Sequence, residues 1–237
     1  MQKAIVIGAS SGIGLELSKI LAKSNHLVGI TGRRKTLLKN LQAESPTYFI
    51  VESFDCTKEN AIEHLEKLVN KLNGLDVLIF NSGMGEINKN LNYTIEEETN
   101  KLNVVAFTKI VGWGFNYFKN QGQGQLVAIS SIAGLRGGRH APAYNASKAY
   151  QISYLEGLRQ KTKKLNLNIT ITDIRPGFVD TDMAKGDGKF WVAPKEKAAK
   201  QIYNHIVRKN DVAYVTKRWY FVAIFVKILP NWLYNRL

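Results

Sequence analysis

The 237-residue chain has a single cysteine, Cys56, and so has no second thiol with which to form an internal disulfide. Disulfides are typical of oxidising compartments, so this composition favours a reducing one, and we expect a cytoplasmic protein. The first residues pass from a short apolar run into a glycine-rich loop, a pattern unlike a secretory signal. Low-complexity tracts and fixed-period repeats are also absent from the sequence. We therefore expect residues 1–237 to form a single domain.

Long hydrophobic runs are missing as well. The apolar run Trp219–Val226 belongs to an apolar C-terminal extension, residues 217–237. It is far shorter than the roughly 20 residues that a membrane-spanning helix needs. The basic flanks of the run and its Trp and Tyr content leave three interpretations open. The extension lies in an anionic membrane interface as a peripheral contact, packs in a subunit interface, or closes the core.

Acidic residues are outnumbered, with 19 Asp and Glu against 33 Lys and Arg, and the formal net charge is +14. The basic residues are scattered along the chain and form no long run. This pattern favours a solvated basic surface over a nucleic-acid groove, and we expect no nucleic-acid partner. The alternative use of the charge is an anionic partner: a phosphorylated cofactor, an acidic lipid or, against this expectation, nucleic acid.

What the chain does contain is a strand-like run that leads into a glycine turn. Residues 3–8 are apolar and end in glycine, and Gly12 and Gly14 precede a helical pattern that extends to about Ala22. A turn that enters a helix exposes free backbone N–H groups, and glycines let a pyrophosphate approach them. The turn therefore predicts a dinucleotide-phosphate site, although its G-x-x-x-G-x-G spacing differs from the commoner G-x-G-x-x-G. A purely structural turn is the alternative.

The second apolar run, Leu27–Thr31, is followed by Gly32, Arg33 and Arg34. A site for the unphosphorylated cofactor usually has an acidic residue here to bind the ribose hydroxyls, and this chain has none. Two guanidinium groups suit a 2′-phosphate, so the pattern predicts NADP(H) over NAD(H). The alternative is a basic start to the next helix, which the helix dipole disfavours.

Further strands and helices alternate along the rest of the chain. The expected strands are 48–54, 75–80, 125–129 and 169–174, and the expected helices are 57–72, 95–118 and 143–165. Such alternation predicts right-handed crossovers and a doubly wound α/β fold, with a mostly parallel sheet and helices on both faces. Ligands then bind beyond the carboxyl ends of the strands. There Asp55 either accepts from an adenine amino group or is simply part of the cap of the next helix, and Thr57 is the expected N-cap of that helix.

Tyr144 and Lys148 are four residues apart in a predicted helix, which places both on one face. A nearby cation favours the phenolate, so we expect Lys148 to lower the pKa of the Tyr144 phenol from about 10. Such pairs also arise by chance. Ser130 and Ser131 end the strand before them, and Asn103 is an unfavoured amide in the middle of a helix, by itself more typical of a structural role.

In these features the chain resembles the short-chain dehydrogenase/reductase family, from about residue 2 to about residue 215. The family's glycine turn, Asn-Ala-Gly turn, helix asparagine, serine thirteen residues before the tyrosine, Tyr-x-x-x-Lys pair and Pro-Gly turn all have counterparts. They fall on Gly8, Gly12, Gly14, Asn81-Ser82-Gly83, Asn103, Ser131, Tyr144, Lys148 and Pro176-Gly177, followed by Val179 and Thr181. The departures, Ile7, Phe80 and Ser82, concern local packing.

The resemblance implies a Rossmann-type fold and hydride transfer between NADP(H) and a carbonyl or secondary alcohol, without a metal. It implies that Tyr144 is the acid/base, that Ser131 holds the substrate oxygen, and that Lys148 binds the nicotinamide ribose. Asn103 would hold a water linked to Lys148 through its main chain. The implied cofactor-binding residues are Gly8, Ser10, Ser11, Gly12, Ile13, Gly14, Arg33, Arg34, Asp55, Cys56, Asn81, Ser82, Gly83, Tyr144, Lys148, Pro176, Gly177, Val179 and Thr181.

The substrate itself is less well defined by the sequence. The resemblance implies that residues 178–194 form a lid over the substrate, in which Gly186 and Gly188 permit movement. Phe190 and Trp191 either line an apolar pocket or are ordinary packing residues. We expect a small hydrophobic carbonyl or alcohol and a homodimer or homotetramer. The alternatives are a catalytically idle dinucleotide-binding sensor or scaffold and, among enzymes, a sugar-nucleotide epimerase or dehydratase, which would be expected to have a longer substrate domain.

Overall fold

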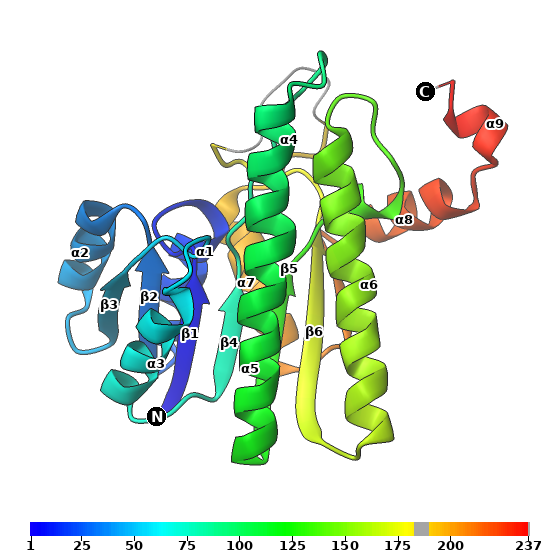
Figure 1. Cartoon of the computed structure of the whole chain (residues 1–237). Coiled ribbons are helices and arrows are strands. Elements are labelled where there is room, and N and C mark those ends of the chain that lie inside the picture. The colour runs from blue at the N-terminus through cyan, green and yellow to red at the C-terminus, as the bar shows by residue number, and fades with distance from the viewer. Residues whose placement is uncertain (183–189, 237) are drawn as a thin grey trace.

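The computed structural model describes residues 1–182 and 190–236, and Figure 1 presents its arrangement. Within these ranges the strands form one seven-stranded sheet in the order β3-β2-β1-β4-β5-β6-β7. Their bounds are β1 Gln2–Ile7, β2 His26–Gly32, β3 Phe49–Ser53, β4 Val77–Phe80, β5 Gln123–Ile129, β6 Asn168–Pro176 and β7 Val212–Val215. Every neighbouring pair is parallel, which confirms the expected doubly wound α/β fold.

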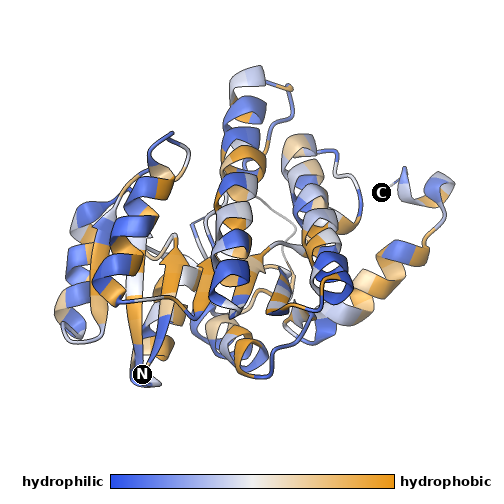
Figure 2. Cartoon of the chain, turned by 60° about the horizontal axis from the view of Figure 1, so that its bottom comes forward, coloured by the Kyte–Doolittle hydropathy of each residue, from blue (hydrophilic) through white to orange (hydrophobic). Residues whose placement is uncertain are grey.

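Helices cover both faces of the sheet. Their bounds are α1 Gly12–Lys23, α2 Lys35–Glu44, α3 Ala61–Leu72, α4 Tyr93–Asn100, α5 Phe107–Gln121, α6 Pro142–Lys164, α7 Lys195–Val207, α8 Arg218–Ile228 and α9 Asn231–Tyr234. Helices α3, α5 and α6 pack on one face, and α1, α2 and α7 pack on the other. Strands buried on both faces have nearly continuous apolar sequences, as in β4, all four residues of which are buried. Figure 2 shows this apolar sheet between helices with polar outer faces.

The chain reverses its direction across the sheet between β1 and β4. From β1 it proceeds outward through β2 to β3, then returns to place β4 on the other side of β1. The turns after these two strands therefore lie side by side, and Asn81 Nδ2 donates to Gly8 O at 2.8 Å. This is the topological switch point at which doubly wound folds bind their ligands.

The helix expected over 95–118 consists of three segments. An α-helix, α4, is followed by a π-helical turn, Lys101–Ala106, and then by α5. The turn contains Asn103, whose side chain contacts the loop after β4 and α6 instead of solvent. Mid-helix π-turns are rare and often mark functional sites.

Two details of the expected secondary structure are wrong. Helix α3 begins at Ala61, and Thr57 does not cap it: the Thr57 N–H and hydroxyl both donate to Asp55 Oδ1, at 2.9 and 2.8 Å. The aspartate thus forms a local turn that delays the helix. Strand β7 was not expected, because only two of its four residues are buried and it lacks the continuous apolar run of β4.

The C-terminal extension forms α8 and α9, which lie beside the main body near the N-terminal part of α6 (Figure 1). Trp219 is 1% exposed, and its indole packs on the backbone of Gly177, where a Cβ would lie 2.1 Å from Trp219 Cε2. Other large apolar residues of the extension are exposed. None of the helices in the described ranges is long and apolar enough to cross a membrane.

Candidate active site

A cavity of about 1320 Å³ opens at the carboxyl ends of the strands. It is lined by the turns after β1, β2, β3, β4, β5 and β6 and by residues of α6 and the C-terminal extension. Every residue predicted from the sequence to be catalytic or cofactor-binding lines this cavity except Gly14 and Asn103. One cavity therefore brings together side chains that are far apart in the chain, such as Ser11 and Thr181, which are 170 residues apart.

The glycine turn after β1 leaves its backbone open to the cavity. Gly8 and Gly12 have φ angles of +90° and +58°, which side chains rarely tolerate. Gly14 has a different role: a Cβ there would lie 2.1 Å from Gly8 O, so its absence lets α1 pack tightly on the turn. Ser11, the N-cap of α1, has extended backbone, and its hydroxyl does not cap the helix. The first N–H groups of α1 are therefore available to an anion, and the turn fits a dinucleotide pyrophosphate.

The two arginines after β2 take different positions at the edge of this turn. Arg34 Nη2 donates to Ser10 Oγ at 2.8 Å and to Ser11 Oγ at 2.7 Å, which places its guanidinium over the glycine turn. Arg33 lies near Asp55: burial alone would raise the pKa of the Asp55 carboxyl, but hydrogen bonds from Thr57 and the charge of Arg33 hold it below its usual value. Both guanidinium groups line the cavity.

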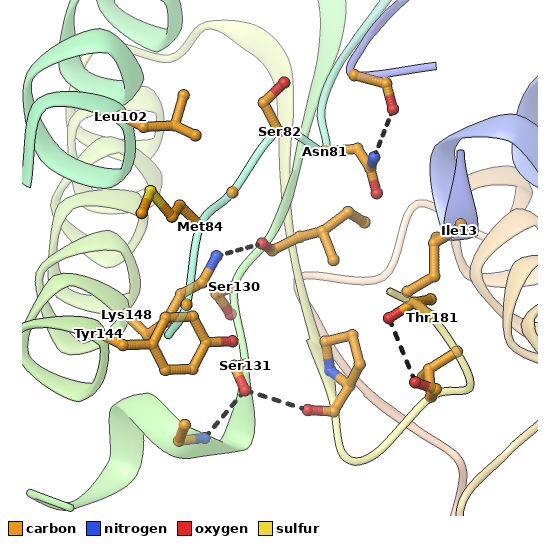
Figure 3. A pocket seen from close by; sticks show the side chains of 18 of the residues that line it. Ile13, Asn81, Ser82, Met84, Leu102, Ser130, Ser131, Tyr144, Lys148 and Thr181 are labelled. Atoms are coloured by element: carbon orange, nitrogen blue, oxygen red, sulfur yellow. Dashed lines mark hydrogen bonds between the residues drawn. The ribbon is translucent and has the colours of Figure 1, made fainter. Parts of the chain in front are cut away.

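Tyr144 and Ser131 face each other in the cavity (Figure 3). Ser131 lies two residues after the end of β5, and its hydroxyl accepts from the Ala133 N–H at 3.1 Å and donates to Pro176 O at 3.4 Å. Tyr144 comes from the first turn of α6. Burial raises the pKa of the Tyr144 phenol, and a hydrogen bond with Ser131 opposes the rise. The expectation of a lowered phenol pKa is therefore wrong.

Lys148 lies under the tyrosine ring and does not bond to its hydroxyl. Its Nζ is 5.9 Å from the Tyr144 ring centroid and donates to Ile129 O at 3.0 Å and to Gln151 Oε1 at 2.9 Å. Burial lowers the pKa of the Lys148 ammonium to about 8, and the nearby charge of Asp173 limits the fall. The ammonium is thus held by two neutral acceptors, and its pKa of about 8 lies close to neutral pH.

Asn103 supports the site without lining it. Its Oδ1 accepts from Met84 N at 2.9 Å, and its Nδ2 donates to Met84 O at 2.7 Å and to Ser147 Oγ at 3.0 Å. The Asn103 main-chain oxygen accepts from Gln151 Nε2 at 2.9 Å. The side chain of Gln151 therefore stands between Asn103 and Lys148, where the family resemblance implied a water. Sequence reasoning missed Gln151, although its position three residues after Lys148 on one helix face was a usable signal.

The two serines at the end of β5 have separate partners. Ser130 Oγ donates to Asp173 Oδ1 at 2.5 Å, and Asp173 also accepts from Arg175 Nε at 2.7 Å. These groups are almost fully buried. Ser130 thus belongs to a buried polar cluster between β5 and β6, whereas Ser131 faces the tyrosine.

One part of the cavity wall is largely apolar. It is formed by Phe190, Trp219 and Val226, and Arg136 and Tyr234 also line the cavity. The Arg136 guanidinium lies 4.3 Å from the Tyr234 ring centroid, and its Nη1 donates to Leu229 O at 3.2 Å, which ties the C-terminal extension to the loop after β5.

Part of the expected lid can be placed against this cavity. Of its two aromatic residues, Phe190 lines the cavity, whereas Trp191 does not and is 49% exposed. Gly186 and Gly188 of the expected lid lie outside the described residues. The sequence did not identify Arg136, Val226 or Tyr234 as wall residues.

Comparison with known proteins identifies the chain. The family model described as short chain dehydrogenase matches residues 2–190. This protein belongs to the short-chain dehydrogenase/reductase family. An uncharacterized oxidoreductase of Myxococcus xanthus is 30% identical over 98% of this chain and 94% of its own length. The fold and the family together identify an NAD(P)-dependent short-chain oxidoreductase.

Two further matches are a protein similar in sequence and a solved structure similar in fold. A protein named 11-beta-hydroxysteroid dehydrogenase 1A, from Arabidopsis thaliana, is 27% identical over 95% of this chain and 71% of its own length. A 3-ketoacyl-(acyl-carrier-protein) reductase from Brucella melitensis, solved with NADH, superposes with a TM-score of 0.82 at 20% identity. That superposition covers 90% of this chain and 96% of the reductase, and it shows that the two share a fold.

Proposed function

We propose that this short-chain dehydrogenase/reductase catalyses NADPH-dependent reduction of a hydrophobic ketone or aldehyde, with Tyr144 as the proton donor. The observation that carries the proposal is that Ser131 and Tyr144 face each other in a cavity whose wall also includes the apolar side chains of Phe190, Trp219 and Val226. Two hydroxyl groups can there bind one carbonyl oxygen, while the apolar walls receive the body of the substrate.

The nicotinamide supplies the hydride when the cofactor is bound. Ser131 and Tyr144 would donate hydrogen bonds to the carbonyl oxygen as negative charge develops on it, and Tyr144 would then give up its proton. Because burial raises the pKa of its phenol, Tyr144 is protonated at neutral pH, which suits the reductive direction. The positive charge of Lys148 would stabilise the phenolate that forms.

The preference for NADP(H) rests on the arginine pair. Arg33 and Arg34 both line the cavity beyond the end of β2, and no acidic residue stands between β2 and α2 to bind unphosphorylated ribose hydroxyls. Guanidinium groups bind a phosphate bidentately, so a 2′-phosphate has two donors here. Asp55 is bonded to Thr57 and would mark the adenine end of the site.

We also propose that the chain forms a homodimer or homotetramer in the cytoplasm. Its single cysteine, Cys56, is buried, and burial raises the pKa of its thiol to about 11, so it is poorly suited to redox chemistry or cross-linking. Native mass spectrometry of the full chain measures the assembly directly.

The experiment that tests the function is a panel of ketones, aldehydes and secondary alcohols, followed by NADPH and NADH absorbance, with the wild type and Tyr144→Phe. Turnover of apolar carbonyls with NADPH, lost in Tyr144→Phe while NADPH still binds, supports the proposal. Tight NADPH binding with no turnover of any compound would instead favour a dinucleotide-binding sensor or scaffold.

A further inference from the structure

We propose that the C-terminal extension seats this protein on an anionic lipid surface through one face of α8 and α9. We call this the C-terminal apolar face. Its members are large apolar side chains that are 41–72% exposed: Phe221, Ile224, Phe225, Ile228 and Trp232. The proposed membrane contact uses a surface outside the catalytic centre, so it does not depend on whether the proposed reaction is correct.

Helix α8 has two apolar sides, and among the residues that the structure describes only one of them is packed against the main body. Trp219 and Ala223 are each 1% exposed and attach the helix to the main body. On the other side, Phe221, Phe225 and Ile228 follow an i, i+4, i+7 spacing that places them in one stripe along the helix. Figure 2 shows the apolar character of this helix beside the main body. A contiguous stripe of large, exposed apolar side chains on the surface indicates an interaction site.

The charges around the face indicate a lipid occupant. Residues 217–237 contain four basic side chains and no acidic one, and all four are exposed: Lys217, Arg218, Lys227 and Arg236. A second copy of the chain would bring the same cations against them, and each copy has a formal net charge of +14. An anionic lipid surface instead offers opposite charge to the basic residues and an apolar layer to the aromatic ones.

The length of the segment determines how it can lie. Helix α8 has 11 residues, and α9 has four, separated by Leu229 and Pro230. Because roughly 20 residues are needed to span a bilayer, the helix can only lie flat, with its stripe at the depth of the headgroups. Trp232 suits this depth, and Arg236 lies 5.7 Å from its ring centroid, so cation and aromatic group are presented together.

The other side of the same segment lines the catalytic cavity. Trp219, Val226 and Tyr234 belong to the cavity wall. A protein seated through the C-terminal apolar face would therefore hold the apolar end of its cavity next to the lipid. This consequence, unlike the seat itself, rests on the proposed function, because it implies that an apolar carbonyl compound can enter from the bilayer.

The test is sedimentation of the full-length protein with vesicles of phosphatidylcholine alone and of phosphatidylcholine mixed with phosphatidylglycerol. We expect most of the protein to pellet with the mixed vesicles and little with phosphatidylcholine alone. The triple variant Phe221→Ser, Phe225→Ser, Ile228→Ser should lose at least tenfold in vesicle affinity. The matched control Tyr93→Ser, Leu165→Ser, Val207→Ser removes exposed apolar side chains elsewhere and should pellet like the wild type.

A second variant separates charge from apolar contact. Lys227→Glu should weaken binding to the mixed vesicles, and added salt should weaken wild-type binding in the same way. Melting temperature and NADPH binding in solution, measured for each variant, show that the fold is retained. Failure of the wild type to pellet, or equal pelleting by the triple variant, overturns the proposal. So does a dimer that the triple variant dissociates while vesicles bind nothing. A carbonyl panel without turnover bears on the proposed function alone.

Discussion

Gln151 joins Lys148 to the main-chain oxygen of Asn103. Its Oε1 accepts from Lys148 Nζ and its Nε2 donates to Asn103 O, each at 2.9 Å, and its side chain is fully buried. The Gln151 side chain holds the Lys148 ammonium in a fixed position, because both its oxygen and its nitrogen make hydrogen bonds. An amide exchanges protons much less readily than a water, so this link holds the ammonium in place better than it conducts protons away from it.

Replacing Gln151 with Leu should move the alkaline limb of the pH profile. Burial lowers the pKa of Lys148 to about 8, so the ammonium is charged below that pH and is lost as the pH rises through it. We therefore expect kcat/KM for NADPH, which reports on the cofactor-free enzyme, to fall above about pH 8. Losing the acceptor on Nζ should bring that fall about one pH unit lower.

The control for this change is Gln160→Leu, which alters an exposed glutamine on the same helix. It should leave the pH profile where it is. An unchanged profile in Gln151→Leu, with only a lower melting temperature, would mean that Gln151 merely fills space.

The two serines at the end of β5 should respond differently to truncation. Ser131→Ala removes the proposed donor to the carbonyl oxygen and should lower kcat by about 10²- to 10³-fold with a small change in KM. Ser130→Ala takes the hydroxyl from Asp173 Oδ1 and should lower the free energy of unfolding by about 1–3 kcal/mol while kcat stays within a few-fold of wild type. Steady-state kinetics and urea unfolding measure the two effects. A large loss of kcat in Ser130→Ala, with only a loss of stability in Ser131→Ala, would contradict the roles assigned to the two serines.

Arg33→Ala should discriminate between the two nicotinamide cofactors. Loss of a charge-assisted contact to a 2′-phosphate should raise KM for NADPH by about 10- to 100-fold and leave KM for NADH nearly unchanged. Lys35→Ala removes an exposed cation at the start of α2 that does not line the cavity, and it should affect neither constant. Equal effects of Arg33→Ala on both cofactors would refute the preference for NADP(H).

Two tryptophans of the C-terminal extension provide a matched pair for stability. Trp219 is 1% exposed and packs on Gly177, so Trp219→Ala should lower the free energy of unfolding by about 3–5 kcal/mol. Trp232 is 65% exposed, and Trp232→Ala should change it by less than about 0.5 kcal/mol. Urea unfolding of both variants checks the difference, and similar losses would mean that the extension is not anchored by Trp219.

Local patterns were sufficient to predict most of the fold. The glycine turn at Gly8 and the run before it are contiguous, so their geometry follows from adjacent residues, and the strand order then places the Asn81 turn beside them. For the same reason Tyr144 and Lys148 could be paired by spacing alone. Strand β7 was missed because it is an edge strand with only two of its four residues buried, unlike β4, which is buried throughout.

The features that could not be predicted depend on contacts between distant segments. Gln151 gains its role only where α6 passes the π-helical turn, 48 residues away in sequence from Asn103. The raised pKa of Tyr144 depends on how completely the phenol is buried, which no spacing reveals. The extension was ambiguous because α8 is apolar nearly all round, and only the packing of Trp219 shows which side faces inward.

The π-helical turn Lys101–Ala106 connects two helices that pack against different elements. Helix α4 packs against α6, whereas α5 packs against β5. In an unbroken α-helix each residue is rotated by about 100° from the one before it. The face that α4 presents to α6 would then fix the face that α5 presents to β5. The widened turn separates the two, and deleting one residue within it would rotate α4 relative to α5 and carry Asn103 out of register. Length at this position is therefore more constrained than side-chain identity over most of the turn.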